Sequence, residues 1–283
     1  MHVVGASLLL HAACGLALSP SEHDPVRWVL PPQCNASSTF MREALTKAEI
    51  VKAKMEGKYA TLSHDFIRAS MKYARGIFQN YLKKELPELK NPKLLDVGCG
   101  SGYYDIFVHR HYNHRLKLFY FDGRTEDPKS KNMDGYHTDV KIMPFYKNDL
   151  SCTRDFAVAN GVLATNVQLV SASVENLAAF AGTLDMIYSY TSWGFHYPVS
   201  TYASAAFSAL KPGGKLLLTL RAGKRVKLLV AKAQGDGQRQ RYSAAPTEDQ
   251  RQSAIRAGFE CAALPAGTGL LSSWLPLKCT KPS

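Results

Sequence analysis

Apolar and polar positions follow two different patterns along the chain, and the change between them divides the sequence. Between residues 63 and 86, apolar side chains recur at spacings of three and four, which predicts an amphipathic helix ended by Pro87. Residues 40–56 are rich in Ala, Lys and Glu and predict an earlier helix, broken at Gly57. From about residue 90 onward, short runs that are almost wholly apolar replace the helical pattern.

These short runs alternate with helical stretches over the rest of the chain. The predicted strands are residues 93–97, 116–121, 167–172, 184–190, 215–220, 260–264 and 274–280. The predicted helices are residues 103–112, 174–180, 199–210 and 247–257. Strands that are apolar throughout are covered on both faces, so the alternation predicts a doubly wound α/β fold with a mostly parallel sheet.

The beginning of the chain has a different composition. Residues 3–19 are mostly apolar and are fewer than the roughly 20 residues that a membrane-spanning helix needs. We interpret residues 1–18 as a targeting segment, cleaved near Ala17 and directing the protein to an organelle or the secretory pathway, although no basic residue precedes the apolar run. No stable membrane span is expected. Residues 19–57, with four prolines up to position 32, predict a linker and N-terminal extension.

Charge and cysteine content narrow the classes of function. The 283 residues carry a net charge of +12, and nine Lys or Arg against one acid lie between residues 211 and 241. This basic stretch is either a solvated face or a surface for an anionic partner such as RNA. The six cysteines form no CxxC pair and no zinc-ligand cluster, so no metal site is predicted. They are too sparse for a disulfide scaffold, and we expect most of them to be small buried residues.

The strongest motif is the glycine-rich turn Asp96-Val97-Gly98-Cys99-Gly100-Ser101-Gly102 directly after the first predicted strand. Glycines in such a turn let a ligand approach the backbone, and the helix start that follows favours a negative group. A dinucleotide fingerprint would place its third glycine at position 103, which is Tyr103. The spacing therefore disfavours an NAD-binding oxidoreductase.

The G-x-G-x-G spacing, with Asp96 two residues ahead of Gly98, resembles motif I of class I S-adenosylmethionine-dependent methyltransferases. Asp122 follows 24 residues after Gly98, at the end of the second predicted strand, where a carboxylate can accept the ribose hydroxyls. Ser173 and Val174 lie where that family places its adenine-contacting loop. The resemblance covers residues 90–280. It implies a seven-stranded Rossmann-like sheet with an antiparallel last strand, and S-adenosylmethionine as cofactor.

The acceptor pocket is expected beside the end of the fourth predicted strand. Polar and aromatic residues crowd there, with His196 as the candidate base, Tyr197 beside it, Tyr190 next to the cofactor, and Trp193 and Phe195 lining the substrate. On this interpretation residues 58–283 form the methyltransferase domain, with residues 58–90 as a helical cap. Residues 123–161 form a long insertion, and its basic and aromatic residues Lys141, Phe145, Tyr146 and Lys147 are expected to form a lid or substrate wall.

The expected function is methyl transfer to a small molecule. The Asn/Asp-Pro-Pro-Tyr/Phe signature of enzymes that methylate nucleobase or glutamine amino groups does not follow the fourth strand. We expect O-methylation ahead of S- or N-methylation. Two alternatives stay open: an RNA methyltransferase that uses residues 211–241, and a non-catalytic methyltransferase-like binding protein. The oligomeric state is not predicted.

Overall fold

The computed structural model describes residues 28–34, 59–122, 150–190, 192–194, 198–221, 247–263 and 274–283. The targeting segment, most of the linker and the helix predicted at residues 40–56 lie outside these ranges. None of the helices within the described ranges is both long enough and apolar enough to cross a bilayer.

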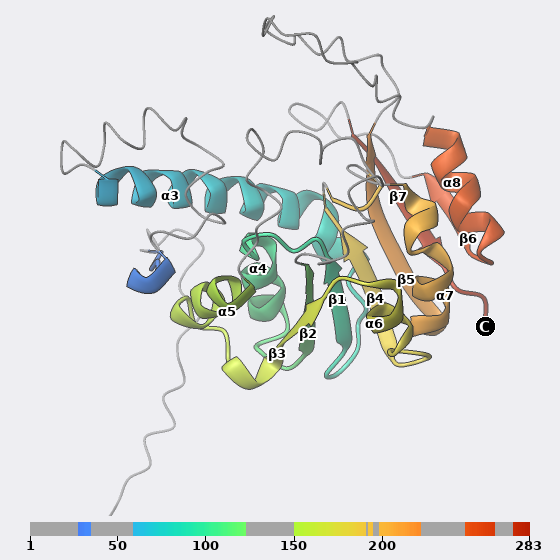
Figure 1. The fold of residues 1–283 in the computed structure, drawn as a ribbon, viewed down its shortest axis with the longest axis horizontal. Helices are drawn as coiled ribbons and strands as arrows, with labels where there is room; N and C mark the ends of the chain where they lie inside the picture. Colours follow the sequence, from blue (N-terminus) through green and yellow to red (C-terminus); the bar gives the residue numbers. More distant parts are fainter. Residues whose placement is uncertain are drawn as a thin grey trace, which may run out of the picture.

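The centre of the molecule is a seven-stranded sheet with the order β3-β2-β1-β4-β5-β7-β6 (Figure 1). Strands β1 to β5 pair in parallel, whereas β7 is antiparallel to both of its neighbours, β5 and β6. The sheet is therefore mixed, and the expected seven strands with an antiparallel last strand are confirmed. The strands are β1 Lys93–Val97, β2 Lys117–Asp122, β3 Val167–Ser171, β4 Leu184–Ser189, β5 Leu210–Arg221, β6 Glu260–Ala263 and β7 Trp274–Thr280.

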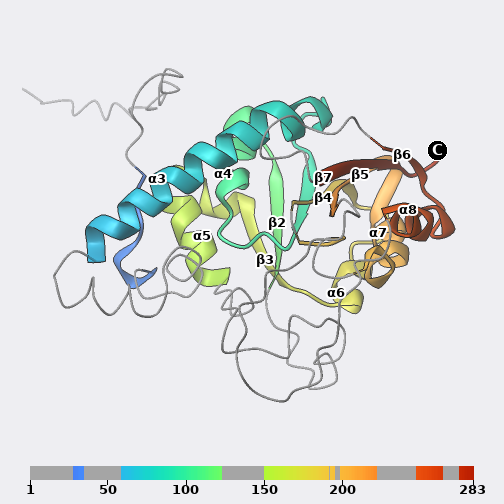
Figure 2. The same ribbon diagram turned by 90° about the horizontal axis from the view of Figure 1, so that it is seen from above.

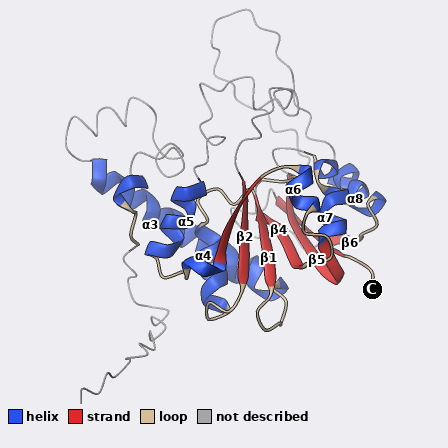
Figure 3. Ribbon diagram, turned by 60° about the horizontal axis from the view of Figure 1, so that its bottom comes forward, coloured by secondary structure: helices blue, strands red, loops and turns tan. Residues whose placement is uncertain are grey.

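Helices cover both faces of this sheet, as Figures 2 and 3 show. One face packs against α3 (Tyr59–Ile77), α4 (Tyr103–His111) and α5 (Leu150–Ala159), and the other against α6 (Val174–Ala178), α7 (Ala203–Ala209) and α8 (Thr247–Arg256). Because alternate strand residues point to opposite faces, Leu94 belongs to the first core and Leu95 to the second. This double burial explains why the strands are apolar throughout.

The predicted helices correspond to observed ones with local changes. The helix expected at residues 63–86 begins earlier and continues after α3 as a π-helical turn, Phe78–Leu82, and a 3-10 turn, Lys83–Glu85. The helix expected at residues 199–210 is divided into the 3-10 turn η8 (Val199–Thr201) and α7. The last residue of that prediction, Leu210, starts β5 instead and pairs with Leu184.

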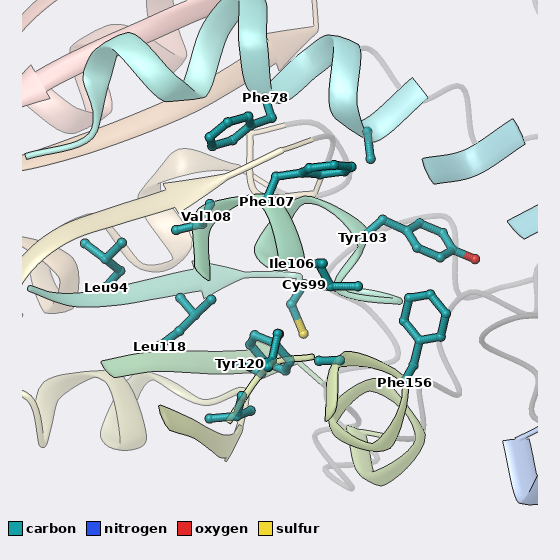
Figure 4. Packing of buried hydrophobic residues seen from close by; sticks show 14 of the residues in the cluster. Phe78, Leu94, Cys99, Tyr103, Ile106, Phe107, Val108, Leu118, Tyr120 and Phe156 are labelled. Atoms are coloured by element: carbon teal, nitrogen blue, oxygen red, sulfur yellow. The ribbon is translucent and has the colours of Figure 1, made fainter. Parts of the chain in front are cut away.

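Two expectations about the chain need correction. The insertion at residues 123–161 contains α5, a crossover helix between β2 and β3 that packs into the first core, so its last part is not a lid. Residues 123–149, which carry Lys141, Phe145, Tyr146 and Lys147, lie outside the described ranges. Figure 4 shows Phe156 of α5 beside Tyr103 of α4, with their ring centroids 5.6 Å apart. The burial of Phe156 fixes α5 against the sheet.

The cysteines are the second correction. Cys34 forms a disulfide with Cys152, and Cys261 forms one with Cys279, so the view of most cysteines as unpaired core residues is wrong for these four. Cys34 and Cys152 are 118 residues apart and meet only because the fold brings the N-terminal segment against α5. Cys261 and Cys279 face each other directly across β6 and β7. Cys99 is buried and without a disulfide, as expected.

Candidate functional site

The glycine turn lies at the carboxyl end of β1, the edge at which parallel sheets bind ligands. Gly98, Gly100 and Gly102 all have positive φ, at 75°, 53° and 67°. At Gly98 a side chain has no room, because a Cβ there would lie 1.8 Å from the hydroxyl oxygen of Ser192, in the segment after β4. A Cβ on Gly100 would meet no described atom within 4 Å. The turn thus presents bare backbone on an open side.

Asp122 ends β2 beside this turn, as the sequence predicts. Its Oδ2 accepts a hydrogen bond from the Gly100 N–H at 2.7 Å. The Gly100 carbonyl accepts a second bond from the hydroxyl of Thr153 on α5, also at 2.7 Å. The peptide groups on both sides of Gly100 are therefore fixed, one by a strand end and one by a helix.

Beneath the turn, two acidic side chains share a buried position. Asp96 of β1 and Asp105 of α4 adjoin each other, and no described group donates to Asp96 Oδ1 or Asp105 Oδ2, which are both buried. The other oxygen of Asp105 accepts from the Tyr188 hydroxyl of β4 at 2.5 Å. Burial, followed by the charges of Asp105 and Asp122, raises the pKa of Asp96 well above its usual value. Burial also raises the pKa of Asp105 to about 7. We infer that Asp96 is protonated and lies beside the Asp105 carboxylate.

Tyrosines gather where β4 ends. The ring of Tyr190 lies 4.9 Å from that of Tyr104, the second residue of α4. Tyr73 of α3 adjoins the Tyr190 hydroxyl. Burial, and then the neighbouring Tyr73 and Tyr104, raise the pKa of Tyr190 far above its usual value, so it stays a neutral phenol. The expected helical cap therefore contributes a residue to this corner.

The segment after β4 is held by three side chains. The Ser189 hydroxyl donates to the Val97 carbonyl at 2.6 Å and accepts from the Trp193 N–H at 2.8 Å. The Trp193 indole is fully buried in the second core, and its N–H donates to the carbonyls of Pro198 and Val199. This position gives Trp193 a packing role. The other residues expected here, Phe195, His196 and Tyr197, lie outside the described residues.

Gln250 of α8 connects the two ends of that short segment. Its Nε2 donates to the Gly194 carbonyl at 3.0 Å, and its Oε1 accepts from the Val199 N–H at 3.1 Å. Gln250 is buried, so both bonds are shielded from water. The backbone on either side of residues 195–197 is thus fastened to one side chain.

On the opposite side of β2, the chain after β3 reaches α6. Ser173 caps α6, its hydroxyl accepting from the Asn176 N–H at 3.0 Å, and Val174 is exposed. The Ala172 N–H donates to the Asp122 carbonyl at 3.2 Å, so this loop adjoins the end of β2. The structure therefore brings Ser173, Val174, Asp122 and the glycine turn to one edge of the sheet.

The opposite, amino-terminal edge of the sheet carries an ion pair instead. Asp185, at the start of β4, accepts from the Lys93 N–H at 2.8 Å and from the Lys211 ammonium at 2.6 Å, which is a structural role. The hollow bounded by Asp185, Lys211 and Gly213 is at the amino-terminal edge of the sheet, away from the glycine turn. Within the described ranges no three His, Cys, Asp or Glu side chains group as metal ligands.

The similarity of this chain to known proteins is limited to its backbone structure. No family model matches the chain, and no curated protein does. Among solved structures, the S-adenosylmethionine-dependent methyltransferase SibL in its apo form is 15% identical, with a TM-score of 0.49 over 80% of this chain and 60% of that one. An O-methyltransferase family protein from Burkholderia thailandensis is 14% identical, with a TM-score of 0.48 over 89% and 67% of the two chains. The carbon methyltransferase CurJ is 13% identical, with a TM-score of 0.45 over 77% and 56%. The chain thus spans about three fifths of the length of SibL and CurJ.

Several residues at this edge carried no signal in the sequence. Thr153 lies in a helix that the pattern placed inside an insertion, and Gln250 belongs to a helix distant in sequence from the segment it binds. Tyr73 belongs to an amphipathic helical pattern, so its presence there did not indicate a site. Only the tertiary arrangement, which brings three separate helices to one edge of the sheet, reveals them.

Proposed function

We propose that this protein is an S-adenosylmethionine-dependent methyltransferase. The observation that carries the proposal is the bond from the Gly100 N–H to the Asp122 carboxylate. It joins an open glycine turn to an acid at the end of the neighbouring strand, in the register that a nucleoside-binding α/β sheet requires. The proposal rests on this geometry and on the motif, independently of the weak backbone similarities.

The residues present fit the cofactor. Asp122 offers a carboxylate to a ribose, Gly100 presents open backbone, and Ser173 and Val174 border the same edge. The amino end of α4 favours the negative group of the ligand's methionine part. The Asp105 carboxylate lies beneath the turn, and its negative charge suits a ligand that also carries positive groups. Tyr190 supplies an aromatic face at the end of β4.

When bound, S-adenosylmethionine supplies an already activated methyl group. The chain's own task is then to hold an acceptor in line with it and to take up a proton where the acceptor is a hydroxyl. We assign proton uptake to His196 and the shaping of the acceptor pocket to Phe195 and Tyr197. Gln250 and Ser189 support this assignment, because they fix the backbone at both ends of the segment. We favour a small molecule that is methylated on oxygen.

The disulfides bear on where the protein works. Disulfides form and persist in oxidising compartments. Together with the apolar residues 1–18, the bonds Cys34–Cys152 and Cys261–Cys279 support a location in the secretory pathway or a comparable oxidising compartment.

The described part of the basic stretch gives no support to an RNA substrate. Of the basic stretch, Lys211 is paired with Asp185, and the Lys215 ammonium donates to the Glu85 carbonyl at 3.2 Å. Both side chains are thus occupied within the fold, and neither is at the edge that bears the glycine turn. A protein that binds the cofactor without catalysis would bind in calorimetry yet transfer no methyl group to any acceptor tested.

The test replaces the proposed ribose acceptor. We expect Asp122→Ala to weaken S-adenosylmethionine binding by about 1.5–3 kcal/mol, the scale of a hydrogen bond to a charged group, which is roughly 10- to 100-fold in Kd. Calorimetry measures the change. The control is Glu260→Ala, because Glu260 is exposed and starts β6, five strands away from β2. Equal affinities for wild type and Asp122→Ala would remove the basis of the proposal.

A further inference from the structure

Thr153, in the first turn of α5, contacts the glycine turn in two ways. Its hydroxyl donates to the Gly100 carbonyl at 2.7 Å. Its methyl carbon, Cγ2, would lie only 2.9 Å from a Cβ built on Gly102. Thr153 is fully buried, so both contacts are sheltered from solvent.

The hydrogen bond has a consequence for the backbone on the ligand side. A trans peptide is planar, and its C=O and N–H point in opposite directions. Because Thr153 draws the Gly100 carbonyl toward α5, the N–H of the same peptide, which belongs to Ser101, points away from α5. Asp122 fixes the preceding peptide through the Gly100 N–H. Thr153 and Asp122 therefore orient the two peptide groups of Gly100, and the Cys99 thiol adds a long contact of 3.9 Å to the Gly100 carbonyl.

The residue before Thr153 is Cys152, whose disulfide to Cys34 fastens the same helical turn. The first turn of a helix is where intrahelical hydrogen bonds are missing, so it loosens most easily. The second half of α5 and the residue after it have other attachments, since Phe156 is buried and Asn160 exchanges hydrogen bonds with the backbone of Val29 at 3.0 and 2.8 Å. Among the described contacts, the disulfide is the covalent attachment of the first turn.

The segment that carries Cys34 is itself anchored. Its Trp28 ring lies 5.9 Å from that of Phe107 and 5.0 Å from the guanidinium carbon of Arg110, both on α4. Leu30 is buried in the first core, and Cys34 is fully buried. Residues 28–34 thus join α4, which follows the glycine turn, to α5, which supports it.

We propose that Thr153 is a positioning residue for the cofactor-binding turn and that the Cys34–Cys152 disulfide holds it there, so that cofactor affinity depends on this disulfide. The inference rests on the proposed function for the identity of the ligand. Its mechanical part, the support of Gly100 by α5, concerns the protein without ligand.

The chain provides its own controls. Cys34→Ser/Cys152→Ser removes the proposed support, whereas Cys261→Ser/Cys279→Ser removes the other disulfide, between β6 and β7 at the far edge of the sheet. Thr153→Val removes the hydroxyl with little change in the shape of the side chain, whereas Thr153→Ser keeps the hydroxyl. We expect the Kd for S-adenosylhomocysteine to rise about 3- to 10-fold in Cys34→Ser/Cys152→Ser and in Thr153→Val, the range for one net hydrogen bond. The other two variants should stay within about twofold of wild type.

A variant that combines the disulfide and Thr153 substitutions tests whether the disulfide acts through Thr153 or only loosens the protein as a whole. If the disulfide acts through Thr153, adding Cys34→Ser/Cys152→Ser to Thr153→Val should raise the Kd no further, because coupled residues are not additive. Hydrogen exchange on the protein without ligand gives a second readout. The Gly102 N–H, which donates to the Cys99 carbonyl at 2.9 Å, should exchange faster in Cys34→Ser/Cys152→Ser and in Thr153→Val, but not in Cys261→Ser/Cys279→Ser.

The outcomes distinguish this inference from the proposed function. If wild type binds neither S-adenosylmethionine nor S-adenosylhomocysteine, the proposed function fails, and the exchange rates still decide whether α5 supports the turn. If wild type binds and Cys34→Ser/Cys152→Ser binds equally well with unchanged exchange at Gly102, the inference is overturned while the proposed function stands. Additive losses in the combined variant would overturn the route through Thr153.

Discussion

Replacing Gln250 by leucine tests how the segment after β4 is held. Gln250 is buried and provides the partners of two backbone groups, the Gly194 carbonyl at 3.0 Å and the Val199 N–H at 3.1 Å. Leucine has a similar volume but neither donor nor acceptor, so both groups would be left buried and without this partner. Leaving one such group unsatisfied costs about 1–3 kcal/mol.

The expected loss of stability follows from these two groups. Their sum is about 2–6 kcal/mol, and we expect the lower half, about 2–4 kcal/mol, because leucine regains some apolar contact. For a domain of this size, each kcal/mol lowers Tm by about 2–4 °C, so Gln250→Leu should melt roughly 4–16 °C below wild type.

The matched control is Gln252→Leu in the same helix. Its Nε2 donates to the Glu248 carboxylate at the surface, and substitutions at such sites stay within about 0.5 kcal/mol. Urea unfolding with intact disulfides gives the free energies, and methyl-transfer turnover should fall further in Gln250→Leu than in Gln252→Leu. If the two variants unfold with the same free energy, Gln250 does not hold this segment as described.

Two further predictions concern proton transfer. His196→Asn should lower turnover on a hydroxyl acceptor by about 10²- to 10⁴-fold, because the acceptor's proton needs a base. Turnover should recover in part at high pH, and cofactor affinity should not change. Normal turnover of this variant would exclude the role of His196 as the base. Asp105 binds a proton in the native state up to a pKa of about 7, whereas the unfolded chain releases it near pH 4, so its contribution to stability falls as pH rises between these values. Asp105→Asn should therefore gain in Tm relative to wild type between pH 5 and pH 8, and a gap that stays constant with pH would contradict the raised pKa.

The sheet could be predicted from sequence because its strands carry a local signal. The central parallel strands β1, β2 and β4 are buried on both faces, so their apolar runs stand out. The boundaries of β1 and β7 agree with the prediction to the residue. Strand β5 begins earlier than its apolar run, because Leu210 already pairs with Leu184 before the turn at Gly213 and Gly214. That early pairing is a tertiary contact with no local pattern of its own.

Only those parts of the site that follow from a local sequence pattern could be predicted. The glycine turn is a continuous motif, and Asp122 follows from the end of the next strand. Thr153 could not be found, since nothing in residues 150–159 indicates which carbonyl its hydroxyl would contact. The Cys34–Cys152 bond spans 118 residues, beyond any spacing rule. The Cys261–Cys279 bond was accessible in principle, because the two cysteines lie in the last two predicted strands, which pair with each other.

The most direct test of the central claim is calorimetry of the wild-type protein with three ligands in parallel: S-adenosylmethionine, S-adenosylhomocysteine and NAD. The open turn at Gly100, the carboxylate of Asp122 beside it and Tyr103 in place of a third dinucleotide glycine predict one-site binding of the first two ligands and no binding of NAD. Binding of NAD without binding of S-adenosylmethionine, or binding of none of the three, would contradict the assignment of this edge as a methyl-donor site.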